Sequence, residues 1–189
     1  MRIATGPLTP QVTRQGLTTT RIFGLAGWSG SGKTTLMTAL IPEFVARGIT
    51  VSTVKHAHHS FDIDQPGKDS WRHRQAGARE VMIASGRRWA LMRELQDDPE
   101  PSLDELVQRM SPVDLVLVEG FKRHPHPKIE VYRRSLGKPL LHPDDAYVIA
   151  IASDERLPEF AVPWLPLSDA GAIASFILRH DGGFAQWRS

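Results

Sequence analysis

The 189-residue sequence contains no cysteine and no asparagine. Without cysteine, the chain cannot form a disulfide scaffold, a thiolate zinc site, an iron–sulfur cluster or a cysteine nucleophile. This composition suits a reducing compartment. No apolar run approaches the roughly 18 residues that a membrane span requires. No basic segment followed by an apolar stretch marks a signal peptide at the N-terminus. We therefore expect a cytoplasmic protein that does not contact a membrane.

Neither sign of charge is in large excess, because the formal net charge is only +2. That balance gives no reason to expect nucleic-acid binding. The basic residues are unevenly spread, however, and a cluster in the middle of the chain is either a solvated face or a patch for an anionic partner. This basic cluster consists of Lys68, Arg72, Arg74, Arg79, Arg87, Arg88 and Arg93.

The order of apolar segments predicts one α/β domain over residues 21–182, preceded by an N-terminal extension over residues 1–20. The length fits a single domain of about 100–200 residues. Strands alternating with helices favour a P-loop NTPase-like, mostly parallel sheet with flanking helices. We expect strands over residues 21–26, 49–55, 114–118 and 147–152, and an added β-hairpin over residues 128–141.

Local signals mark the helices between these strands. Apolar spacing predicts a helix from Lys33 that ends before Gly48, a residue type common just after a helix. Ser102 and Glu105 form the pattern of a capping box at the start of another helix. Ser168 is the expected cap of a last helix, which the glycines at 182 and 183 would stop.

The most informative motif is a full match to G-x-x-x-x-G-K-[ST], which we call the phosphate loop. Glycines allow the backbone to turn tightly and to aim N–H groups at phosphate oxygens. In this motif the lysine reaches the β- and γ-phosphates, and the hydroxyl that follows binds Mg²⁺. An apolar strand before it and an amphipathic helix after it supply the required context. The loop consists of Gly27, Trp28, Ser29, Gly30, Ser31, Gly32, Lys33 and Thr34.

Besides this hydroxyl, Mg²⁺ needs an acidic ligand, which should lie at the carboxyl end of another buried strand. Asp114 begins the third expected strand, whereas Glu119 follows its end. We therefore predict that Thr34 and Glu119 hold the metal, and that Asp114 points to the opposite edge of the sheet. The competing reading is that Glu119 only caps the next turn.

The segment after the second strand is rich in histidine and aspartate: it contains His56, His58, His59, Asp62 and Asp64. We favour a switch-like loop in which Asp62 or Asp64 assists catalysis by holding Mg²⁺ or orienting water. A transition-metal site and a purely structural loop are the alternatives, and no regular ligand spacing supports the metal. We place His124 and His126 on the surface.

The base is not specified by the phosphate loop. Many guanine-binding proteins use Asn-Lys-x-Asp, which a chain without asparagine cannot contain. Asp154, just after the strand over residues 147–152, is the candidate carboxylate for reading guanine. The alternative is that Asp154 is an ordinary turn residue.

Several stretches in this order resemble one family, that of the molybdopterin-guanine dinucleotide biosynthesis adapter, MobB. The phosphate loop with Thr35 is the generic part of the likeness. The specific parts are Lys55-His56 with His58-His59, then Pro66-Gly67-Lys68-Asp69-Ser70, then Arg88-Trp89-Ala90-Leu91-Met92, and finally Val118-Glu119-Gly120-Phe121-Lys122. The likeness covers about residues 21–180 and leaves the first twenty unexplained.

The resemblance implies a homodimeric, GTP- and Mg²⁺-binding adapter with weak GTPase activity. Such a protein assists the molybdopterin guanylyltransferase that joins GMP to molybdopterin, and molybdopterin itself is a further candidate ligand. The resemblance also implies added strands that dimerise, for which we choose residues 128–141. Two other functions use the same loop: a small-molecule kinase, and a metal-delivery GTPase suggested by the histidines.

Overall fold

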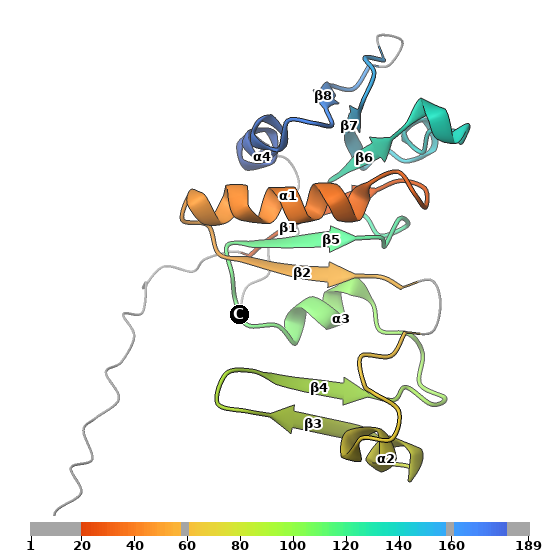
Figure 1. The fold of residues 1–189 in the computed structure, drawn as a ribbon. Coiled ribbons are helices and arrows are strands. Elements are labelled where there is room, and N and C mark those ends of the chain that lie inside the picture. Colours follow the sequence, from red (N-terminus) through yellow and green to blue (C-terminus); the bar gives the residue numbers. More distant parts are fainter. Residues whose placement is uncertain (1–19, 58–60, 158–160, 181–189) are drawn as a thin grey trace, which may run out of the picture.

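The computed structural model describes residues 20–57, 61–157 and 161–180. Its centre is a six-stranded parallel sheet with the strand order β2-β5-β1-β6-β7-β8. The strands are β1 (Arg21–Ala26), β2 (Val51–Lys55), β5 (Leu115–Glu119), β6 (Lys128–Tyr132), β7 (Val148–Ser153) and β8 (Trp164–Pro166). The predicted mostly parallel α/β fold is confirmed (Figure 1).

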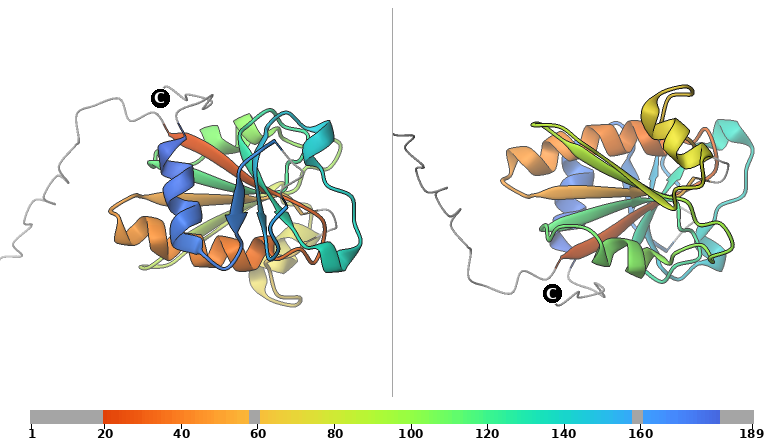
Figure 2. Two further views of the ribbon diagram at one scale, coloured as in Figure 1. Left: turned by 90° about the horizontal axis from the view of Figure 1, so that it is seen from above. Right: turned by 90° about the horizontal axis from the view of Figure 1, so that it is seen from below.

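Helices cover both faces of this sheet. On one face, α1 (Lys33–Ala46) and α4 (Ala170–Arg179) pack side by side over β1, β5, β6 and β7, with Leu40, Phe44 and Ile177 fully buried. On the other face, the short α3 (Leu103–Gln108) buries Leu103 and Val107 against β1 and β5. Figure 2 shows the sheet between these layers from its two sides. Burial on both faces explains why the central strands are almost continuously apolar.

A smaller unit branches from the β2 side of the sheet. It contains α2 (Asp69–Gln75) and an antiparallel hairpin of β3 (Glu80–Ala84) and β4 (Trp89–Arg93). In Figure 1 this unit lies at the bottom of the view, with α3 between it and the sheet. None of the helices in the described ranges is long and apolar enough to cross a bilayer.

The local helix signals are largely confirmed. Ser102 caps α3 through a complete capping box with Glu105. Gly48, which follows the C-cap residue Arg47 of α1, has a φ of 75°, a conformation that suits glycine. The last helix begins as expected, but its cap is Asp169, whose carboxylate accepts from Ala172 N at 2.8 Å, and not Ser168. The extension over residues 1–19 and the stop at residues 182 and 183 lie outside the described residues.

The predicted hairpin over residues 128–141 is wrong, although an added hairpin exists elsewhere, at β3–β4. The first half of the segment is β6, which pairs in parallel with both β1 and β7. The second half does not return as a strand; it forms the 3₁₀ turns η1 (Arg134–Leu136) and η2 (His142–Asp144). The buried Glu130 carboxylate accepts from the backbone N–H groups of Leu141 and His142, which holds that segment as a loop.

The surface placement of the two histidines at 124 and 126 is wrong for His126, which is 0% exposed. Its ring fills the space above Gly24, where an added Cβ would lie 2.3 Å from the His126 Nε2 atom. Burial, and then the Lys128 charge, lower the pKa of His126 to about 3, so the imidazole is neutral at physiological pH. A glycine on the neighbouring strand therefore makes room for a core histidine.

Candidate functional site

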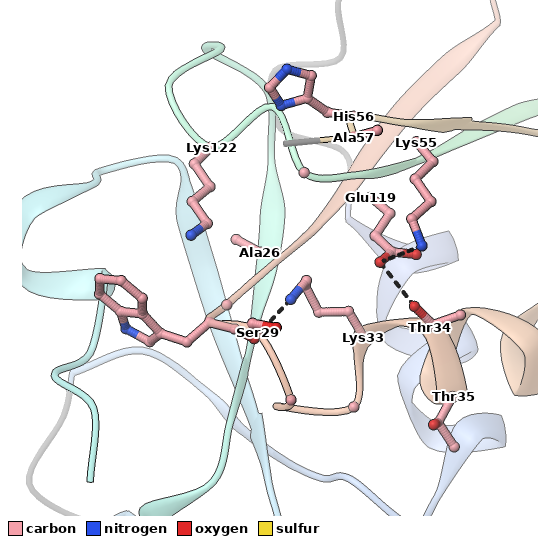
Figure 3. Close-up of a pocket in the computed structure, with 15 residues that line it drawn as sticks. Ala26, Ser29, Lys33, Thr34, Thr35, Lys55, His56, Ala57, Glu119 and Lys122 are labelled. Atoms are coloured by element: carbon pink, nitrogen blue, oxygen red, sulfur yellow. Dashed lines mark hydrogen bonds and ion pairs between the residues drawn. The ribbon is translucent and has the colours of Figure 1, made fainter. Parts of the chain in front are cut away.

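The phosphate loop leaves β1 and enters α1 at the carboxyl edge of the sheet, where β2 and β5 also end. In parallel α/β sheets this edge is where ligands bind. A cavity of about 700 Å³ opens there (Figure 3). It is lined by Ala26, Gly27, Trp28, Ser29, Gly30, Gly32, Lys33, Thr34, Thr35, Lys55, His56, Ala57, Glu119, Gly120 and Lys122. Ser31 is the one predicted loop residue not in that lining, because it is buried beneath the loop.

Glycine is required at two positions of the loop for different reasons. Gly27 has a φ of 136°, and a Cβ there would lie 2.4 Å from the carbonyl oxygen of Val131 on β6. Gly32 is the N-cap of α1 with a φ of 101°, and no side chain caps that helix end. The first N–H groups of α1 are thus left to a ligand, and the helix dipole favours an anion at this position.

Lys33 bends back over the loop, where its Nζ donates to the Trp28 carbonyl oxygen at 2.8 Å. Burial lowers the pKa of Lys33; Lys122 and Lys55 act in the same direction and the Glu119 carboxylate opposes them. A bound phosphate would supply the negative charge that this group of ammonium ions attracts.

Thr34 and Glu119 are brought together as predicted. The Thr34 hydroxyl donates to the Glu119 Oε1 atom at 2.9 Å, and the Lys55 Nζ atom lies 3.4 Å from the same oxygen. Glu119 is only 9% exposed. Asp114 lies at the other end of β5, where it accepts from the backbone N–H and the hydroxyl of Thr50. The hydroxyl and the carboxylate together offer the hard oxygen ligands that Mg²⁺ prefers.

Asp154 follows β7 and is bound to the phosphate loop through an arginine. The Arg133 Nη1 atom lies 2.7 Å from Asp154 Oδ2, and Arg133 Nε donates to the Ser31 carbonyl oxygen at 3.1 Å. The candidate base-reading carboxylate is therefore one side chain away from the loop that would hold the phosphates.

Asp62 and Asp64 are not among the residues that line the cavity. Both contact Arg74 of α2, at 2.7 Å for Asp62 and 3.3 Å for Asp64, and Arg74 also contacts Glu94 at 2.8 Å. Arg74 lowers the pKa of Asp62. Asp62 and Asp64 thus tie the loop before α2 to that helix, while Glu94 ties the helix to the end of the hairpin. The predicted catalytic role of the two aspartates gains no support from this geometry.

The basic cluster is partly neutralised in the same way. Arg74, Arg79 and Arg93 are paired with carboxylates of Asp62, Asp98, Glu80 and neighbouring residues. This pairing favours the interpretation of a solvated face for Arg79 and Arg93, whereas the Arg74 side chain is only 12% exposed.

The histidine-rich segment is only partly described, since His58 and His59 lie outside the described residues. His56 lines the cavity; its Nε2 lies 2.7 Å from Glu100 Oε1, and its ring packs on Phe121 with centroids 4.8 Å apart. Within residues 20–57, 61–157 and 161–180, no three His, Asp or Glu side chains are grouped to hold a metal ion.

Three cations near the loop were not singled out as site residues from the sequence: Lys55, Lys122 and Arg133. Lys55 is the last residue of β2, and Lys122 comes three residues after the end of β5. Both therefore lie at the carboxyl ends of strands, a position that marks candidate ligand-binding residues in a parallel sheet. Arg133 could not have been found in this way, because residues 128–141 were assigned to a hairpin outside the sheet.

A second cavity, of about 790 Å³, lies between β2, α3 and the hairpin, and shares Lys55, His56 and Ala57 with the first. Its hairpin wall includes Trp89 and Leu91. Trp89 is 68% exposed, Leu91 is 47% exposed, and Met82, the cross-strand partner of Leu91, is 63% exposed. These three side chains form an exposed apolar face on the hairpin.

Comparison with known proteins gives a consistent family. The model of the MobB family, described as molybdopterin guanine dinucleotide synthesis protein B, matches residues 22–154. A molybdopterin-guanine dinucleotide biosynthesis adapter protein of Haemophilus influenzae is 47% identical over 159 residues, which cover 82% of this chain and 86% of the relative. A protein with the same description from Escherichia coli is 45% identical over 166 residues, covering 86% and 94% of the two chains.

Solved structures agree with the sequence comparison. A crystal structure of molybdopterin-guanine biosynthesis protein B superimposes with a TM-score of 0.65 and 30% identity, over 83% of this chain and 97% of the other. The region that the family model matches, residues 22–154, contains the phosphate loop, Glu119 and the hairpin.

Proposed function

Because this chain belongs to the MobB family, we propose that it is a GTP-binding adapter in molybdenum cofactor biosynthesis. In this role it assists the guanylyltransferase that joins GMP to molybdopterin. Relatives that are 45–47% identical over most of their length carry the adapter description, which supports the same role here.

The observation that carries nucleotide binding is the complete phosphate loop, which lies between β1 and the N-terminus of α1. Gly27 and Gly32 adopt backbone conformations that suit glycine, α1 begins without a side-chain cap, and Lys33 lies over the loop. These are the elements that bind the phosphates of a nucleotide. The oxygens of Thr34 and Glu119 fit Mg²⁺, which would neutralise and orient the β- and γ-phosphates when bound.

Preference for GTP is the part of the proposal that rests on Asp154. A carboxylate can accept from the ring N–H and the amino group of guanine, and adenine offers no matching pair of donors on that edge. Asp154 stands at the carboxyl end of β7, two strands from the phosphate loop in the order β1-β6-β7. Arg133 holds the carboxylate in place beside the loop.

Weak hydrolysis fits the same site. Among the described residues that line the cavity there is no arginine and no glutamine, the side chains that commonly stabilise the transition state or orient water. A protein that holds GTP without hydrolysing it rapidly suits an adapter better than a catalyst.

Homodimerisation belongs to the proposal as well, and the hairpin β3–β4 replaces residues 128–141 as the proposed dimer contact. The exposed apolar side chains of Met82, Trp89 and Leu91 lie on one face of the hairpin. Contiguous exposed apolar surface marks protein interaction sites. A second copy of the chain is the occupant that the family resemblance favours for this face, and the guanylyltransferase would then bind elsewhere.

Calorimetric titration with GTP and with ATP, both with Mg²⁺, tests the nucleotide part. We expect wild type to bind GTP more tightly than ATP, and Lys33→Ala to lose most of that affinity while Lys138→Ala, an exposed lysine outside the cavity lining, keeps it. Unchanged affinity in Lys33→Ala would remove the phosphate-loop assignment. Equal or stronger ATP binding, with phosphate transferred to a small acceptor, would favour a kinase.

The adapter part needs a separate assay. Purified guanylyltransferase should form molybdopterin guanine dinucleotide faster in the presence of the wild-type chain than in that of Lys33→Ala. No difference between the two would show that nucleotide binding by this chain does not serve the partner enzyme.

A further inference from the structure

The ammonium group of Lys122 lies against an aromatic ring at the rim of the cavity. Its Nζ is 4.7 Å from the centroid of the Trp28 indole. The indole itself is fixed, because its Nε1 donates to the Pro139 carbonyl oxygen at 2.6 Å. Lys122 lines the cavity, and among the residues that the structure describes no carboxylate pairs with its ammonium group.

This ammonium lies in the same cavity as the lysine of the phosphate loop. The lysine of a phosphate loop, here Lys33, binds the β- and γ-phosphates. Figure 3 shows the side chains of Lys122 and Lys33 in the same cavity, and after burial the positive charge of Lys122 is one of the causes that lower the pKa of Lys33. Figure 3 shows Lys122 and Lys55 on opposite sides of Lys33, with Glu119 on the Lys55 side. Lys122 therefore approaches the outer phosphates from the side away from the metal ligands.

The backbone that carries Lys122 is held in an unusual conformation. Gly120 has a φ of 97° and Phe121 a φ of 47°, both in the left-handed region. A Cβ at Gly120 would lie 2.8 Å from the His56 Cβ atom, and the Phe121 ring packs on the His56 ring. Non-glycine residues adopt this conformation rarely, and such residues cluster at functional sites. The turn directs the chain after Glu119 back over the loop.

We propose that Lys122 binds the terminal phosphate of the nucleotide and that Trp28 positions it there. The inference rests on the proposed nucleotide-binding function and adds the residue that distinguishes a triphosphate from a diphosphate. When the site holds no triphosphate, the ammonium lies on the indole. When a γ-phosphate arrives, the ammonium moves onto its oxygens. A cation–π contact is weaker than a charge-assisted hydrogen bond to phosphate, so the ammonium exchanges its contact with the indole for one with the phosphate.

Lys122 also fills, in a limited way, the place of an arginine finger. It would reach the phosphates from the turn that follows Glu119, so the cation comes from the nucleotide-binding chain itself and not from a partner protein. A compact ammonium binds the γ-phosphate as a point charge and does not make the bidentate contacts of a guanidinium. Recognition of the triphosphate with little acceleration of its hydrolysis follows from that difference, and it suits an adapter whose GTP-bound form must persist.

The test is the ratio of dissociation constants for GDP and for a non-hydrolysable GTP analogue, measured by calorimetry with Mg²⁺. In Lys122→Met we expect this ratio to fall about tenfold or more, through loss of affinity for the triphosphate alone. Lys122→Arg should restore most of the ratio, because the charge is retained. Trp28→Leu should lower the ratio by a smaller factor, since the cation remains but is no longer positioned.

Lys138→Met is the matched control. The Lys138 ammonium is 5.9 Å from the same Trp28 ring, yet Lys138 does not line the cavity. We expect its ratio to equal that of wild type. An unchanged ratio in Lys122→Met, or an equal loss of GDP and triphosphate affinity, would overturn the inference while leaving nucleotide binding intact. A wild-type chain that binds neither nucleotide would instead refute the proposed function itself.

Discussion

The hydroxyl of Thr34 and the carboxylate of Glu119 meet at 2.9 Å, although the two residues are 85 positions apart in the chain. Thr34 comes from the first turn of α1, and Glu119 is the last residue of β5. The adjacent parallel strands β1 and β5 end at the same edge, and this brings the two oxygens together. Lys55 contacts the same carboxylate, so a bound metal would have to compete with its ammonium.

Glu119→Gln should therefore weaken Mg²⁺-dependent GTP binding by about tenfold, because the neutral amide is a poorer ligand for a hard cation. Binding without metal should change much less. Calorimetry with Mg²⁺ and with a chelator measures both. Asp114→Asn, at the opposite end of β5, is the control and should behave as wild type; equal weakening with and without metal in Glu119→Gln would show that Glu119 is not a metal ligand.

Asp154→Ala should reduce the preference for GTP over ATP by about tenfold, because one hydrogen-bonded carboxylate typically contributes roughly 1.5–3 kcal/mol. The measurement is the ratio of the two affinities. The neighbouring Glu155, which pairs with Arg134 at 3.3 Å, provides the control variant Glu155→Ala. If both variants keep the wild-type ratio, Asp154 does not read the base.

The hairpin should carry the dimer contact. In the double variant Met82→Ser/Leu91→Ser, loss of two facing apolar side chains should raise the dimer dissociation constant at least about tenfold, since each buried side chain of this size contributes about 1.5–3 kcal/mol. Light scattering coupled to gel filtration reports the mass. Val45→Ser, which changes a 60% exposed apolar residue on α1, should leave it unaltered. A double variant that remains as dimeric as wild type would place the interface elsewhere.

His126 should make the fold sensitive to acid. The unfolded chain takes up a proton near pH 6.5, whereas burial in the fold lowers the pKa of His126 to about 3. Its stabilising effect is complete above pH 6.5 and is lost as the pH falls towards 3. The free energy of unfolding should fall by about 1 kcal/mol per pH unit more in wild type than in His126→Gln.

Urea unfolding at a series of pH values measures that difference. Burial raises the pKa of the neighbouring Glu130, but Glu130 is present in both proteins and so does not account for a difference between them. Parallel pH profiles for wild type and His126→Gln would show that His126 is not the group that titrates.

The sequence alone determined the parts of this protein that depend on neighbouring residues. Continuous apolar runs gave the buried parallel strands, the Ser102–Glu105 capping box gave the start of α3, and the spacing of glycines, Lys33 and Thr34 gave the phosphate loop. Glu119 could be paired with Thr34 in advance, because the carboxyl ends of parallel strands share one edge whatever the details of packing.

Only the tertiary structure decided what depends on partners far away in the chain. Glu130 is buried and satisfied by the N–H groups of Leu141 and His142, and this made β6 a central strand followed by a loop. Arg74 pairs with Asp62 and Asp64 away from the cavity, whereas Arg133 reaches the phosphate loop from a segment that no local pattern marked. Burial of a charged group is favourable only when distant atoms compensate it, and no short stretch of sequence shows whether they do.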